Sequence, residues 1–72
     1  MNEAVQKRKK YMLGMAKDIM SRADRLIDEI EDLESSDDLY VIEMGFDQIE
    51  SWGREGYEVC RNTYDEFEEE EK

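Results

Sequence analysis

Apolar residues recur in alternating steps of three and four along almost the whole chain, and this spacing constrains the fold more than any other feature. In the first half the seam reads Met12, Ala16, Ile19, Ala23, Leu26, Ile30 and Leu33. In the second half it reads Leu39, Ile42, Phe46, Ile49, Gly53, Gly56, Cys60, Thr63 and Phe67. Such steps place side chains along one side of an α-helix. The chain is therefore predicted to be all-α.

A polar break separates the two runs. Ser35 and Ser36 are good N-caps, and Asp37 and Asp38 suit a first helical turn, because a carboxylate there faces the positive end of the helix dipole. We expect a helix over residues 3–34, a turn over 35–37, a second helix over 38–67 and an acidic tail over 68–72. β-branched and aromatic residues within 39–42 leave a short strand there as the alternative.

A short connection makes two long helices antiparallel neighbours. Folding at the break pairs positions whose numbers sum to about 72, so that Met12 meets Cys60 and Leu26 meets Phe46. The second helix has no side chains at Gly53 and Gly56. This lets the backbones of the two helices approach each other, or admits a side chain from a second subunit. The fold predicted from the sequence is an antiparallel helical hairpin.

A chain of 72 residues has a small core, and its Leu, Ile, Val and Phe residues number only fourteen. There is no metal-ligand cluster and only one cysteine, so oligomerisation is the remaining way to stabilise such a domain. We expect a homodimer that forms a four-helix arrangement. The residues expected at its interface flank the seam and have little to cover them in one hairpin: Met15, Trp52, Tyr57, Val59 and Tyr64.

The stretch from Leu26 to Gly53 holds ten carboxylates and no Lys, Arg or His. Ordinary surface helices mix the two signs to gain pairs between neighbouring turns. Carboxylates three or four residues apart on a helix are displaced by about 5 to 6 Å, a spacing similar to that of phosphates along a nucleic acid strand. A surface of this kind can occupy the basic groove of a DNA-binding protein. The residues expected to form it are Asp28, Glu31, Asp32, Glu34, Asp37, Asp38, Glu43, Asp47 and Glu50.

Charge is uneven along the chain, with a net +4 over residues 1–26 and a net -15 over residues 27–72. Folding at the break brings the carboxylates of Asp65, Glu66 and residues 68–71 beside the basic residues 7–10. We expect these carboxylates to neutralise the basic residues, which leaves the carboxylates of the turn end uncompensated.

In size, acidity and lack of catalytic residues, the chain resembles the small bacteriophage host-takeover proteins that mimic DNA, among them inhibitors of the bacterial histone-like protein HU. The resemblance covers the whole chain and rests on composition and on the carboxylates of residues 28–50. It implies a basic nucleoid or transcription protein as the partner, no direct contact with nucleic acid, and action in the host cytoplasm.

Several other interpretations stay open. The carboxylates can be a solvated polar face, or the chain can be a non-mimetic interaction module that uses an aromatic surface at Trp52 and Tyr57. The basic first helix can touch a membrane or RNA, as in the helical-hairpin dimer that regulates plasmid copy number. Calcium is a further candidate, because Asp32, Glu34, Ser36 and Glu43 follow an EF-hand spacing, although Asp37 stands where that loop needs glycine.

No catalytic, cofactor-binding or metal-binding residue is expected. The chain has no His to act as a general base, no glycine-rich phosphate loop and no second cysteine for redox or metal chemistry. The single Cys60 cannot form an internal disulfide, and no apolar signal region or membrane span is present. We therefore expect a non-enzymatic protein of the reducing cytoplasm with no membrane partner.

Overall fold

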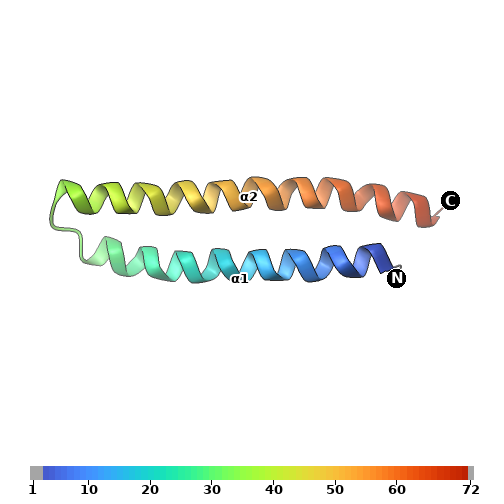
Figure 1. Ribbon diagram of the computed structural model, residues 1–72, viewed down its shortest axis with the longest axis horizontal. Coiled ribbons are helices and arrows are strands. Elements are labelled where there is room, and N and C mark those ends of the chain that lie inside the picture. The colour runs from blue at the N-terminus through green and yellow to red at the C-terminus, as the bar shows by residue number, and fades with distance from the viewer. Residues whose placement is uncertain (1–2, 72) are drawn as a thin grey trace.

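The computed structural model describes residues 3–71, and the side chains of residues 3–68. Helix α1 spans Glu3–Glu31 and helix α2 spans Ser36–Glu71. The two helices run antiparallel, side by side, in a rod whose Cα atoms extend over 57 × 15 × 11 Å (Figure 1). The prediction of an all-α antiparallel hairpin is confirmed, and residues 39–42 are helical rather than extended.

The connection between the helices is residues 32–35, slightly earlier than predicted. Helix α1 ends at Glu31 with a tightened turn, in which Leu33 N donates a hydrogen bond to Ile30 O at 3.2 Å. Helix α2 begins at Ser36 and continues to Glu71, so the segment expected to be an acidic tail prolongs the helix. The side chains of 69–71, and residue 72, lie outside the described residues.

The seam between the helices differs from the predicted one at every second position. In α1 the least exposed side chains are Ala4, Val5, Arg8, Met12, Met15, Ile19, Arg22, Ala23, Leu26 and Glu29. In α2 they are Asp38, Ile42, Gly45, Ile49, Trp52, Gly56, Val59, Thr63 and Glu66. Apart from the adjacent residues Ala4 and Val5, and Arg22 and Ala23, the steps are again threes and fours. The residues shared with the predicted seam are Met12, Ile19, Ala23 and Leu26 in α1 and Ile42, Ile49, Gly56 and Thr63 in α2. Leu39, Phe46 and Phe67 lie outside the observed seam and are exposed.

The core of a single hairpin is thin. Val5, Leu26 and Ile42 are its buried apolar residues, and among the described side chains none is less than 2% exposed. The expected contact between Met12 and Cys60 is present, with the two sulfur atoms 3.6 Å apart. Within residues 3–71, neither helix contains an apolar stretch long enough to cross a membrane.

Candidate interaction surfaces

An ion pair lies in the seam, in the half of the hairpin nearer the turn (residues 19–53, the turn half). Arg22 Nη1 is 2.7 Å from Glu29 Oε1, and the two side chains are only 12% and 17% exposed. Arg25 Nε approaches the same oxygen at 3.6 Å. The other oxygen, Glu29 Oε2, is buried and has no hydrogen-bond partner in the described structure. The charge of Glu29 is thus neutralised inside the hairpin, and both arginines are used there.

Gly45 makes room for this ion pair. A Cβ atom at Gly45 would lie 2.5 Å from Arg22 Nη2 and 2.8 Å from Leu26 Cδ2. By contrast, a Cβ at Gly53 would have no atom within 4 Å, and one at Gly56 would lie 3.8 Å from Met15 Cε. The close approach expected at Gly53 is therefore absent from the hairpin, and it occurs at Gly45.

Asp38 is occupied in capping helix α2. Its Oδ2 atom accepts hydrogen bonds from the backbone N–H groups of Glu34, at 2.9 Å, and Ser35, at 3.1 Å. The carboxylate at the third helical position reaching back to the N-cap N–H is half of a capping box. These backbone hydrogen bonds, with Glu34 first, lower the pKa of Asp38. Asp38 therefore fixes the turn and is only partly available to a partner.

Most of the other predicted carboxylates are unpaired. Glu50 Oε1 lies 3.1 Å from Arg54 Nη2, with both side chains at least 70% exposed. Such exposed pairs contribute little to stability and are easily exchanged for another partner. The rest are exposed and form no ion pair with any described side chain: Asp28, Glu31, Asp32, Glu34, Asp37, Glu43 and Asp47.

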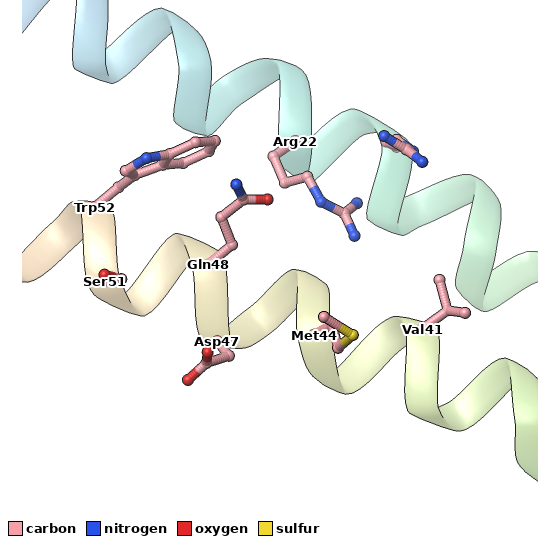
Figure 2. Close-up of a pocket in the computed structure, with 8 residues that line it drawn as sticks. Arg22, Val41, Met44, Asp47, Gln48, Ser51 and Trp52 are labelled. Carbon is pink, nitrogen blue, oxygen red and sulfur yellow. The ribbon is translucent and has the colours of Figure 1, made fainter.

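These carboxylates are spread over two edges of the rod. An α-helix turns about 100° per residue, so Asp28 lies on the far side of α1 from the seam residue Leu26, and Asp47 on the far side of α2 from Ile49. Figure 2 shows Asp47 pointing away from α1. The two helical sets converge only at the turn, where Glu34 and Asp37 join them.

The residues expected at a dimer interface fall into two groups. Met15, Trp52 and Val59 are half-buried in the seam of one hairpin, so the expectation that little covers them is wrong. Figure 2 shows Trp52 and Arg22 reaching between the helices from opposite sides. Tyr57 and Tyr64 are 65% and 66% exposed, as expected for residues that one hairpin leaves uncovered.

One long face of the hairpin, which we call the apolar face, carries uncovered apolar side chains from both helices. In each helix they occupy the positions immediately after the seam residues, and because the helices are antiparallel these positions lie on the same side of the rod. A hollow on this face is lined by residues of both helices, among them Met12, Cys60 and Phe67. The large side chains of the face, each at least 41% exposed, are Leu13, Met20, Ile27, Ile30, Leu39, Phe46, Tyr57, Tyr64 and Phe67.

The opposite long face is more polar. Its largest groove, about 550 Å³, is lined by Arg22, Arg25, Val41, Met44, Asp47, Gln48, Ser51 and Trp52 (Figure 2). Both arginines that line the groove are already bound to Glu29. The groove is open and is lined by both polar and apolar side chains. The apolar surface that one hairpin leaves uncovered is concentrated instead on the apolar face.

At the open end of the hairpin, opposite the turn, the expected neutralisation of the basic residues 7–10 is partial. Arg8 Nη2 lies 3.1 Å from Glu66 Oε1. The hydroxyl of Tyr11 donates a hydrogen bond to Glu55, and this bond raises the pKa of Tyr11. Lys7, Lys9 and Lys10 form no ion pair with a described side chain, and the expected partners within 69–71 lie outside the described side chains.

The EF-hand spacing does not correspond to a loop. Ser36 and Glu43 both lie in α2, and the connection contains only residues 32–35, whereas an EF-hand wraps twelve residues around its ion. The side chains of residues 3–68 contain no group of three potential metal ligands.

Comparison of the chain with protein-family models, with curated proteins and with solved structures gave no match. The function is therefore inferred from the surfaces of this chain. The sequence pattern missed two features, the Arg22–Glu29 pair and the close approach at Gly45, because it sought only apolar residues in the seam. An unbroken series of threes and fours from Val5 through Arg8, Arg22 and Glu29 was the available signal.

Proposed function

We propose that the protein is a dimeric, non-catalytic binding protein whose acidic turn half occupies the DNA-binding surface of a basic protein and displaces DNA. The basic partner is of the HU type or another nucleoid or transcription protein. A second copy of the chain covers the apolar face and completes a four-helix arrangement.

The exposed area supports the second copy. A compact monomer of 8.6 kDa exposes about 4,700 Å², whereas the hairpin exposes 5913 Å². The surplus, roughly 1,200 Å² per chain, exceeds the about 800 Å² that each partner buries in a standard protein interface. Most of the uncovered large apolar side chains lie on one face, which is where an interface would remove them from water.

The unpaired carboxylates carry the functional proposal. Four arginines, Arg8, Arg22, Arg25 and Arg54, have carboxylate partners in the hairpin, and no basic residue lies between Leu26 and Gly53. Seven exposed carboxylates of the turn half form no ion pair with any side chain that the structure describes. An excess of one sign on a helical scaffold attracts a surface of the opposite sign and speeds its association.

A competition experiment tests the proposal. A labelled DNA duplex bound to a purified HU-type protein is titrated with this protein, and fluorescence anisotropy reports the displaced DNA. We expect displacement that weakens steeply with salt. Replacing Asp28 and Asp32 by Lys, at positions away from the apolar face, is expected to raise the half-displacing concentration at least tenfold. The matched control, Glu58→Lys with Asp65→Lys, makes the same charge change in the other half of the hairpin, also away from the apolar face, and is expected to have a much smaller effect.

The rival function, an interaction module with an aromatic hot spot, makes the opposite prediction. Binding would depend little on salt and would be lost on replacing Tyr57 by Ala, and the lysine variants would bind normally. Trp52 is a weaker candidate for that hot spot than the sequence indicated, because the hairpin itself half-buries it. Equal loss of displacement in the Asp28/Asp32 and Glu58/Asp65 variants would show that net charge alone causes the effect, and would contradict the proposed surface.

A further inference from the structure

We infer that the second copy lies head to tail on the apolar face, so that the turn of each hairpin lies at the open end of the other. This inference rests on the dimer proposed above and adds its orientation. The orientation follows from the charges on the side of each helix that faces away from the seam.

The outermost positions of each helix form a row that faces away from the seam. In α1 this row is Glu3, Lys10, Lys17, Asp24 and Glu31, and in α2 it is Tyr40, Asp47, Arg54, Arg61 and Glu68. When a partner covers the apolar face, these rows border the new contact between helices, as the flanking positions of a coiled coil do. Charges in such positions set partner orientation.

A dimer with both turns at the same end brings like charges together. Twofold symmetry then places α1 beside α2 of the partner subunit at the same height, where residue numbers sum to about 71, as they do for Leu26 and Gly45 in the hairpin. Lys10 meets Arg61 of the partner subunit, and Lys17 meets Arg54 of the partner subunit. Asp24 meets Asp47 of the partner subunit. Each repulsive contact occurs twice.

The head-to-tail dimer brings opposite charges together. Here α1 lies antiparallel to α1 of the partner subunit, and from Lys10 to Glu31 the row carries two positive and then two negative side chains. Lys17 comes beside Asp24 of the partner subunit, and Lys10 beside Glu31 of the partner subunit. In the same register, Asp47 on α2 comes beside Arg54 of the partner subunit.

The overall charge agrees with this orientation. Residues 19–53, the turn half, contain eleven carboxylates and two arginines, whereas the remainder of the chain contains ten carboxylates and eight basic residues. The same-end dimer gathers both strongly acidic halves at one end, and the head-to-tail dimer separates them. The dimer therefore has two acidic sites, one at each end, and binds two partner molecules.

The position of Gly53 also suits the head-to-tail dimer. It lies midway along α2 on the apolar face, where a Cβ would have no atom within 4 Å in the hairpin. A glycine inside an exposed helix lowers helix stability by about 1 kcal/mol relative to alanine. Near the twofold axis, however, it lets the two α2 helices approach each other closely.

Charge exchange on α1 distinguishes the two orientations. The dimer dissociation constant is measured by sedimentation equilibrium at low salt for Lys17→Asp, Asp24→Lys and the double variant. The head-to-tail dimer predicts that each single change raises the constant about three- to tenfold, since each creates two like-charge contacts, and that the double variant regains the original value. The same-end dimer predicts tighter association for each single variant. Lys7→Asp and Asp28→Lys, on the opposite side of α1, are matched controls and are expected to stay within twofold.

A distance measurement gives the orientation directly. A spin label is attached at Ser35→Cys in a Cys60→Ser background, and pulsed electron resonance measures the separation of the two labels. Position 35 lies about 27 Å from the middle of α2 at 1.5 Å per residue, so the head-to-tail dimer predicts about 50 Å. A separation below about 25 Å at dimer mass overturns the orientation and leaves the proposed function intact. A monomer mass overturns the dimer itself, and the DNA competition tests the acidic surface separately.

Discussion

Replacing Gly45 by alanine tests whether the close approach of the two helices at the Arg22–Glu29 pair holds the hairpin together. In most helices this substitution stabilises by about 1 kcal/mol, because alanine restricts the unfolded chain and favours the helix. At Gly45 the added Cβ would lie 2.5 Å from Arg22 Nη2 and 2.8 Å from Leu26 Cδ2. Both side chains must therefore move.

The expected magnitude follows from what these movements break. Moving Arg22 away leaves Glu29, which is only 17% exposed, with Arg25 at 3.6 Å as its remaining partner. A partly buried charged group that loses its hydrogen bond destabilises by about 1 to 3 kcal/mol, and crowding Leu26 adds a similar amount. After subtracting the helix gain of about 1 kcal/mol, we expect Gly45→Ala to lower the free energy of unfolding by about 3 kcal/mol.

Urea denaturation followed by circular dichroism measures this change at one fixed protein concentration. Gly14→Ala is the matched control, because a Cβ there has no atom within 4 Å and lies away from the apolar face, and we expect it to stabilise by about 1 kcal/mol. In an Arg22→Ala background, the loss caused by Gly45→Ala is expected to shrink. If Gly45→Ala stabilises as much as Gly14→Ala does, the packing argument is refuted.

Three further predictions concern the cap, the open end and the apolar face. Because the pKa of Asp38 is lowered, its contribution to stability is fully present above the ordinary aspartate pKa of about 4 and is lost as the pH falls through the lowered value. Asp38→Asn should therefore flatten the acid limb of a stability-against-pH curve. Arg8→Gln should change the free energy of unfolding by less than about 1 kcal/mol, since its pair with Glu66 is partly exposed, as urea titration can check. The exposed thiol of Cys60 should react with a thiol reagent more slowly as protein concentration rises, and a rate independent of concentration would contradict coverage by a second copy.

The sequence pattern predicts the helices better than it predicts the seam. Ser35 and Asp38 mark the start of α2 because capping is a local interaction, so the turn was placed within a few residues. The seam was misplaced because two apolar rows lie next to each other on each helix, one facing the other helix and one facing outward. Hydrophobicity favoured Phe46 and Leu39, whereas the hairpin packs Gly45 and Asp38.

The polar members of the seam explain this error. Arg22 and Glu29 are acceptable between the helices only because they neutralise each other and because Gly45 leaves space for the guanidinium group. Neither condition is visible from hydrophobicity, since each depends on contacts between residues distant in the chain. Hydrophobicity likewise does not show which carboxylates are free to bind a partner protein. Asp38 and Glu29 have roles within the hairpin, whereas Asp47 and Glu43 lack a cation.

The central claim is that one hairpin is an incomplete fold, whose apolar face is covered by a second copy that holds the acidic surfaces rigid. Sedimentation equilibrium combined with circular dichroism over a dilution series tests it most directly. We predict a helical species of about 17 kDa, twice the 8.6 kDa of one chain, that loses helicity as it dissociates. A helical monomer of 8.6 kDa at every concentration would contradict the account.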